Sequence, residues 1–227
     1  DEGSGEDRIQ NGNFVIRDDG KVNSGGGVIL NGRNGDIHIT DDIEAKKGVT
    51  ANITEEGSVY FDREVKVSDD VNVTTENGSI SIGNTVSSEK GTVNLQTGTG
   101  DILVGNDITA EKDVLLSSHE GNIVVGDINT GNDGDVLSKT GKVSIQTGEG
   151  IVGIVKTVTA QQGSIDIQVG GTGGVIIGNN GPDVKTVTAK HTIDIGVDLG
   201  QIKIYGKTST EQGDISMTAG SEHYTPG

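Results

Sequence analysis

Apolar and polar residues alternate in short runs that recur along almost the whole chain. The stretch from Gly78 to Ile123 shows the unit best, because GSISIGNTVSSEKGTVNLQTGT is followed by the similar GDILVGNDITAEKDVLLSSHE. Each copy opens with Gly-x-Ile/Val-x-Ile/Val, crosses a turn, and carries two further short apolar runs. Such alternation is typical of strands with one buried face. Three strands in roughly 21 residues predict one coil of a three-sided parallel β-solenoid.

The opening glycine recurs at intervals of 20 to 23 residues, which predicts about nine to ten coils. It stands at Gly12, Gly35, Gly57, Gly78, Gly100, Gly121, Gly141 and Gly163. Coils stack about 4.8 Å apart, so the expected right-handed parallel β-helix is about 45 Å long. Apolar residues after these glycines should form inward columns, which we expect at Ile37, Ile39, Ile80, Ile82, Ile102, Val104, Ile123, Val125, Val143, Ile145, Ile165 and Ile167.

Pairs of Gly with Asn or Asp follow several of these runs and are expected to turn the corners of the coil. The clearest are Gly83, Asn84, Gly105, Asn106, Gly126 and Asp127. Gly and Asn tolerate positive φ, which suits a sharp turn. The Asn side chains are also expected to hydrogen-bond along the stack.

The rhythm breaks after Gly163, where residues 168–183 read QVGGTGGVIIGNNGPD. We expect an insertion of about seven residues there, with the pattern resuming at His191 and again at Gly213. Gly200 offers a competing match, so the register between 168 and 212 stays open. The expected organisation is one solenoid domain over 12–220, a linker or N-terminal edge over 1–11, and a C-terminal tail over 221–227.

Composition and charge narrow the classes of function. Gly accounts for 38 of 227 residues and aromatics for 2%, so a thin core of Val and Ile is expected. A net charge of −17 disfavours nucleic-acid binding. There is no Cys and no long apolar run, so neither disulfides nor a membrane-spanning helix are expected. Asp1 is not a start codon, and the chain is expected to be a piece of a longer protein.

The phrase Gly-Asp/Asn/Ser-Ile-x-Ile/Val, then Gly-Asn-Asp/Thr-Ile/Val-Thr/Ser-Ala/Ser, closing on Gly-x-Val or Asp-Val-x-Leu, resembles the repeats of filamentous haemagglutinin-type adhesins. The resemblance covers about residues 12–217. It implies a right-handed parallel β-helix and a segment of the stalk of a large exoprotein exported by two-partner secretion. It also implies an outer-membrane transporter as partner of the parent protein. The Asn-Pro-Asn motifs usual in the family's secretion domain are absent here.

Candidate chemistry is sparse. Adjacent acids occur at Asp18-Asp19, Asp41-Asp42, Glu55-Glu56 and Asp69-Asp70, and we interpret them as solvated corner charges, which also discourage strand aggregation. His38, His119, His191 and His223 are too far apart in sequence for a zinc motif. Calcium-binding repeats and a phosphate loop are both missing, so no catalytic residue, cofactor or metal is expected, although incidental calcium binding at an Asp corner stays open.

We therefore expect a non-enzymatic, extracellular or cell-surface stalk segment that supports attachment to host or neighbouring cells. The isolated chain is expected to be monomeric, with a host-cell protein or glycan as a possible receptor. A carbohydrate-active or glycan-binding β-helix module is the alternative, and residues 168–183 would then be its most plausible binding region.

Overall fold

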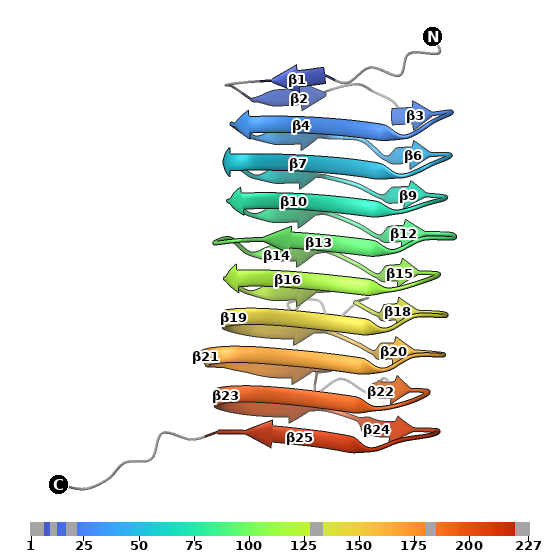
Figure 1. Ribbon diagram of the computed structural model, residues 1–227, viewed down its shortest axis with the longest axis vertical. Coiled ribbons are helices and arrows are strands. Elements are labelled where there is room, and N and C mark those ends of the chain that lie inside the picture. Colours follow the sequence, from blue (N-terminus) through green and yellow to red (C-terminus); the bar gives the residue numbers. More distant parts are fainter. Residues whose placement is uncertain (1–6, 10–12, 17–21, 128–133, 180–184, 221–227) are drawn as a thin grey trace, which may run out of the picture.

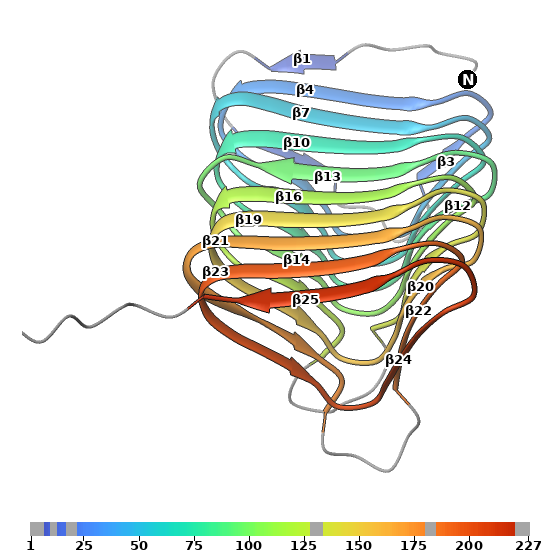
Figure 2. The same ribbon diagram turned by 60° about the horizontal axis from the view of Figure 1, so that its bottom comes forward.

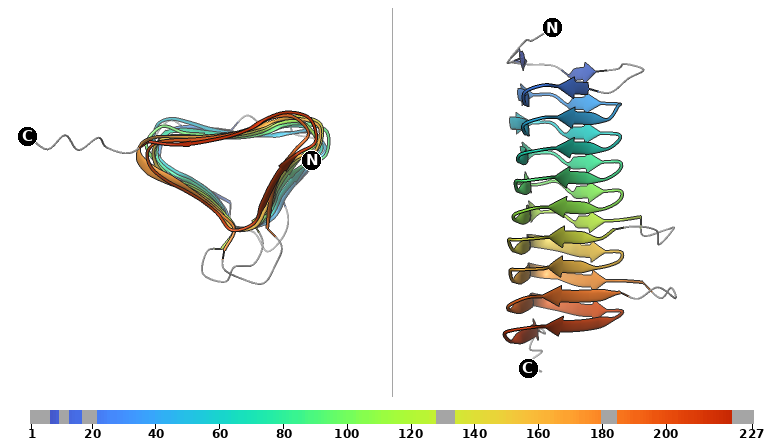
Figure 3. Two further views of the ribbon diagram at one scale, coloured as in Figure 1. Left: turned by 90° about the horizontal axis from the view of Figure 1, so that it is seen from below. Right: turned by 90° about the vertical axis from the view of Figure 1, so that its right-hand side faces the viewer.

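Short parallel strands stack into three flat sides, as the computed structural model shows (Figure 1). The structure describes residues 7–9, 13–16, 22–127, 134–179 and 185–220. Over these residues the chain is an all-β parallel β-solenoid of about nine turns, with about 22 residues per turn and no helix. The fold class expected from the repeat is confirmed. Seen along its axis, the solenoid has a triangular outline (Figure 3).

Side 1 carries the longest strands and faces the viewer in Figure 2. Outward and inward residues alternate along its strands. The part of each strand that lies on side 1 is up to eight residues long, as in the strand Val49–Glu56. The strands are β1 (Asp7–Ile9), β4 (Val28–Asn34), β7 (Val49–Glu56), β10 (Val71–Asn77), β13 (Val93–Thr97), β16 (Val114–Glu120), the first parts of β19 (Val143–Ile154), β21 (Ile165–Ile177) and β23 (Ile193–Ile204), and β25 (Ile215–Ala219).

Sides 2 and 3 are narrower. Side 2 comprises β2 (Phe14–Ile16), β5 (Ile37–Ile39), β8 (Val59–Phe61), β11 (Ile80–Ile82), β14 (Ile102–Val104), β17 (Ile123–Val125) and the second parts of β19, β21 and β23. Side 3 comprises β3 (Val22–Ser24), β6 (Ile43–Ala45), β9 (Val65–Val67), β12 (Val86–Ser88), β15 (Ile108–Ala110), β18 (Val136–Ser138), β20 (Val158–Ala160), β22 (Thr186–Ala189) and β24 (Lys207–Thr210).

The core is a narrow shaft filled by β-branched side chains. On side 2, Ile80 stacks between Val59 and Ile102, and each of the three is fully buried. Val and Ile suit this position because their branched Cβ packs well on a pleated surface. Burial of each such side chain contributes about 1.5–3 kcal/mol relative to exposure, and stacking repeats that contribution in every coil.

The register changes after β17, and here the sequence-based stacking is wrong. Val143 pairs with Val114 on side 1, whereas Val152 is the residue that stacks on Ile123 on side 2. Ile165 likewise stacks on Val143. Strands on sides 1 and 2 both begin with the Gly-x-Val/Ile pattern. Because the connection before β18 is longer than in other coils, the side 1 strand that follows Gly141 falls about 20 residues after Gly121, where the next side 2 strand was expected. The phrase at Gly200 is the true continuation of side 2, because Ile202 stacks on Val175.

Two coils are longer than the others. Stacked residues are 21 or 22 apart in most coils, but Asn122 and Ile151 are 29 apart and Ser164 and Thr192 are 28 apart. The extra residues lie between β17 and β18 and between β21 and β22. The insertion expected over 168–183 was placed too early, since 168–177 belong to β21; residues 180–183 lie outside the described part.

Of the expected linker over 1–11, Asp7–Ile9 forms β1 and pairs with β4. The other linker residues, and the tail expected over 221–227, lie outside the described residues.

Candidate functional site

The outward row of side 2 changes in character along the solenoid. Its residues, one per coil from β5 to β23, are His38, Tyr60, Ser81, Leu103, Val124, Gly153, Ile176 and Lys203. The first three positions are polar or aromatic, and the next four are apolar. The matching rows on sides 1 and 3 stay mostly polar, with Thr50, Asn72 and Asn94 on one and Glu44, Lys66 and Ser87 on the other.

We call Leu103, Val124, Ile151 and Ile176 the apolar patch. Leu103 is 39% exposed, Ile151 44% and Ile176 38%, although each carries a large aliphatic side chain. Single exposed apolar residues are common, but a contiguous group of them marks an interaction surface. The apolar patch is therefore the candidate functional site of the described chain.

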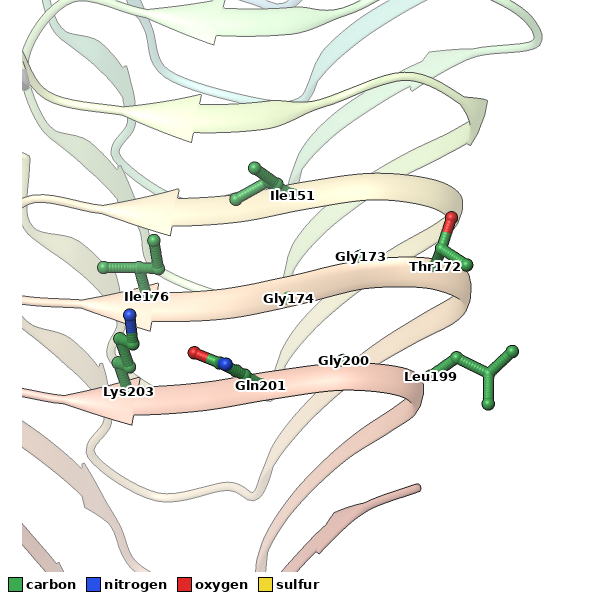
Figure 4. Close-up of a pocket in the computed structure, with 9 residues that line it drawn as sticks. All are labelled: Ile151, Thr172, Gly173, Gly174, Ile176, Leu199, Gly200, Gln201 and Lys203. Atoms are coloured by element: carbon green, nitrogen blue, oxygen red, sulfur yellow. The ribbon is translucent and has the colours of Figure 1, made fainter. Parts of the chain in front are cut away.

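Glycines hollow the surface around the patch. One depression of about 300 Å³ is lined by Leu103, Val124, Ile151, Gly153 and Ile176 among others. A second, of about 430 Å³, lies between Ile151 and Lys203 and includes the backbone of Gly174. Figure 4 shows the second depression, with Lys203 directed toward Ile176 on the neighbouring strand. Both depressions are lined mainly by apolar atoms, and the second is the more open to solvent.

A column of side-chain caps borders the patch. Within it, Asp101 Oδ1 accepts a hydrogen bond from the backbone N–H of Asn122 over 2.7 Å, and Asn122 Oδ1 accepts one from Ile151 over 2.9 Å. The same arrangement occurs in earlier coils at Asn13, Asp36, Ser58 and Ser79. Ile151 has no polar atom with which to continue the column. The column of caps thus ends at Ile151, within the apolar patch.

The corner residues lie at corners, as the sequence predicted. For two of the glycines, however, the reason why glycine is required differs from the expected positive φ. Gly126 has φ of 92°, as expected of a turning glycine, and Gly178, at the same corner two coils later, has φ of 85°. Gly83 and Gly105 do not have positive φ; a Cβ on Gly83 would instead collide with the carbonyl oxygen of Asp62, and one on Gly105 with that of Gly83. Close stacking of coils, rather than turn geometry, excludes side chains there.

Stacked polar residues at the same corner hydrogen-bond along the axis. Asn106 Nδ2 donates to Asn84 Oδ1 over 2.7 Å, which confirms the expected ladder for this pair. Asp127 follows Gly126 at the next corner and is partly exposed. The bond between Asn84 and Asn106 ties two coils together, and all three side chains leave the corner polar.

Carboxylates of the acid pairs accept hydrogen bonds from backbone N–H groups and from a nearby arginine. Asp42 Oδ1 accepts from the backbone N–H of Glu64 over 3.2 Å, and Asp70 Oδ1 from that of Thr92 over 2.8 Å. Glu55 Oε1 accepts from Arg33 Nε over 2.6 Å, and this hydrogen bond, followed by one from Asn34, lowers the pKa of Glu55. The interpretation as merely solvated charges is thus incomplete. Asp18 and Asp19 lie outside the described residues.

His38 has partners that the sequence did not reveal. Its Nε2 lies 2.9 Å from both carboxylate oxygens of Asp62, and its ring packs edge-on against Tyr60 with centroids 5.7 Å apart. The three residues come from neighbouring coils, so only the register of β5 on β8 could have identified the group. The carboxylate of Asp62 and the ring of Tyr60 together fix the orientation of the imidazole.

The inward positions named from the sequence are all buried. Each of the twelve is at most 2% exposed: Ile37, Ile39, Ile80, Ile82, Ile102, Val104, Ile123, Val125, Val143, Ile145, Ile165 and Ile167. Of these, Val143, Ile145, Ile165 and Ile167 belong to side 1, so the twelve form two sets of columns instead of one. The apolar patch was missed because its members are outward residues, and their grouping depends on that register.

In the described part of the chain, no group of three or more His, Cys, Asp or Glu is placed to hold a metal. The same residues include no helix long and apolar enough to cross a membrane. Comparison with family models, with curated proteins and with solved structures gives no match to this chain.

Proposed function

We propose that the chain is a non-enzymatic spacer in the stalk of a bacterial surface or secreted adhesin of the filamentous haemagglutinin type. In this role it holds a binding segment away from the cell and itself makes no specific contact with host receptors. The observation that carries the proposal is the unbroken parallel pairing of side 1 from β4 to β25. Continuous backbone ladders of this kind resist bending and stretching, because each coil is hydrogen-bonded to both neighbours.

Stiffness can be measured directly, because the chain contains no Cys and can be labelled at chosen sites. Thr50 and Asp194 lie in one outward column of side 1, six coils apart. Spin labels at Thr50→Cys and Asp194→Cys should give a narrow distance distribution centred near about 29 Å. A broad distribution would contradict a stiff spacer.

Receptor binding separates the spacer from a glycan-binding module. We expect the isolated chain to give no signal above background on a glycan array and to retain no host cells when coated on a surface. Saturable binding to one class of glycan, lost on Tyr60→Ala but kept on Leu103→Ala, would favour the module instead, since sugars stack on aromatic rings. Tyr60 is the aromatic residue of the outward row of side 2.

A further inference from the structure

The apolar patch has a charge at each end. Leu103 is at one end and Lys203 follows Ile176 at the other, four coils away, which corresponds to about 19 Å. Asp101 lies beside Leu103, two residues earlier in the chain. Lys203 makes no ion pair within the described residues, and Gln201 lies two residues before it in β23. The surface thus runs from an acid, across aliphatic side chains, to a base.

Two copies of this surface are complementary when they meet face to face with their coils in opposite order. Consider a second copy facing side 2, related by a two-fold axis that lies along the strand direction and crosses the row at Gly153. The axis reverses the order of the coils. Val124 of one copy then faces Ile176 of the other, and the Asp101 end of one faces the Lys203 end of the other. Asp101 of one copy then faces Gln201 of the other, with Lys203 diagonally across from it, and this approach occurs twice, as an isologous interface requires.

We infer that the apolar patch is a weak, antiparallel self-association surface that joins two copies of this chain face to face. Gly174 faces the Asn122 position of the other copy, so a hollow opposes a side chain there. Gly153 and Ile151 lie on the axis, and each faces its counterpart in the other copy. A parallel pairing instead places the coil of Lys203 against the same coil and the coil of Asp101 against the same coil, which brings like charges together and is unfavourable.

The size of the patch sets the expected strength. Five strands of about 4.8 Å spacing and about five residues of about 3.3 Å rise give roughly 300–400 Å² per copy. The total buried area then falls below the roughly 1,200 Å² of a standard interface. The net charge of −17 adds repulsion, which ordinary salt screens beyond about 8 Å. We therefore expect dissociation constants in the high micromolar range and a monomer at dilute concentrations.

Sedimentation equilibrium in ordinary salt, from about 5 to about 500 μM protein, tests the association. The weight-average mass should rise from 23.3 kDa toward twice that value as concentration increases. Ile176→Lys should weaken association at least tenfold, because it buries a charge against Val124 of the second copy. Ile29→Lys is the matched control: Ile29 is an equally exposed aliphatic residue on side 1, 43% exposed, and should have no effect. A chain that stays monomeric at all concentrations overturns the inference.

The charge contacts have their own test. Lys203→Asp places an acid on the strand that faces Asp101, two residues from the directly opposed Gln201, and should weaken association at least fivefold. Asp101→Asn keeps the oxygen that caps Asn122 and removes the charge, so combined with Lys203→Asp it should recover part of the loss. An equal effect of Lys203→Asp with and without Asp101→Asn contradicts the contact. Circular dichroism of each variant confirms that the β-fold is retained.

Cross-linking fixes the orientation. A tagged Val124→Cys chain is mixed with an untagged Ile176→Cys chain and treated with bismaleimidoethane. Antiparallel pairing predicts cross-linked products that contain one chain of each kind. Products formed mainly between identical variants indicate parallel pairing and overturn the proposed arrangement. Either failure leaves the spacer function untouched, because the ladders that carry that proposal lie within one chain.

Discussion

Asp36 Oδ1 accepts a hydrogen bond from the backbone N–H of Ser58 over 2.9 Å, joining two coils across 22 residues of sequence. Ser58 Oγ in turn accepts from the backbone N–H of Ser79 over 3.0 Å. Each cap therefore satisfies the first donor of the strand in the next coil, which otherwise would lack a partner at the corner. The caps act with the ladders to hold the corner between sides 1 and 2 in register.

Removing one cap should destabilise the coils on both sides of it. Asp36→Ala leaves the N–H of Ser58 without its acceptor, and we expect a loss of about 1–2 kcal/mol in the free energy of unfolding. Asp36→Asn retains an oxygen at the same place and should lose less than half as much. Urea denaturation followed by circular dichroism gives both values. Equal destabilisation by the two substitutions would show that the charge, and not the acceptor, matters.

Glycines at the corners differ sharply in their tolerance of a side chain. Gly57 has φ of 142°, and a Cβ there would collide with the carbonyl oxygen of Gly35 in the preceding coil. We expect Gly57→Ala to cost about 1–3 kcal/mol, as strained backbone positions do. At Gly25 a Cβ meets nothing within 4 Å, so Gly25→Ala is the control. It should be neutral or stabilising by up to about 1 kcal/mol, because alanine restricts the unfolded chain.

Thermal unfolding of the two glycine variants in parallel provides the comparison. A fall in melting temperature for Gly57→Ala and none for Gly25→Ala agrees with steric exclusion between coils. Similar melting temperatures would mean that the corner relaxes around the added methyl group.

Inward positions could be predicted from the sequence because a strand has a period of two and each coil repeats it. The side to which a strand belongs could not be predicted as reliably. Val143 and Ile123 carry the same local phrase, yet Val143 stacks on Val114 and Val152 stacks on Ile123. Only the length of the connection between β17 and β18 decides between these alternatives, and that connection has no apolar pattern of its own.

The apolar patch depends on the same decision. Once Val152 is aligned with Ile123, Ile151 and Gly153 fall beside Val124 and the outward group becomes visible. In the expected alignment, Ser144 takes the place of Gly153 and the row reads as polar. The stalk function could be suggested only by the resemblance to adhesin repeats, since a stalk has no catalytic motif that a sequence could reveal.

Phe61 is the largest fully buried side chain of the described core and stacks between Ile39 and Ile82. Phe61→Ala removes the whole phenyl ring from the narrow core, and we expect a loss of about 3–5 kcal/mol. Long repeat proteins can unfold in parts. Hydrogen exchange at the amides of Val59 and Ile82 should therefore report the loss locally, with Ile193 as a distant reference. Equal loss of protection at all three amides would indicate a single cooperative unit.

Glu55 gives the chain a defined response to acid. Hydrogen bonds from Arg33 and Asn34 lower the pKa of Glu55 below its ordinary value of 4.5. Because the folded state favours the ionised form, the contribution of this contact is present above pH 4.5 and is lost as the pH falls through the lower, folded-state value. Arg33→Ala should raise the pKa of Glu55 toward 4.5, as measured by NMR titration of its side-chain carboxyl carbon. Arg63→Ala is the control, since Arg63 Nε lies 4.0 Å from Asp41 Oδ1, whereas the guanidinium that hydrogen-bonds to Glu55 is that of Arg33. A pKa that stays low in Arg33→Ala would assign the effect to Asn34, whose Nδ2 lies 2.9 Å from Glu55 Oε2.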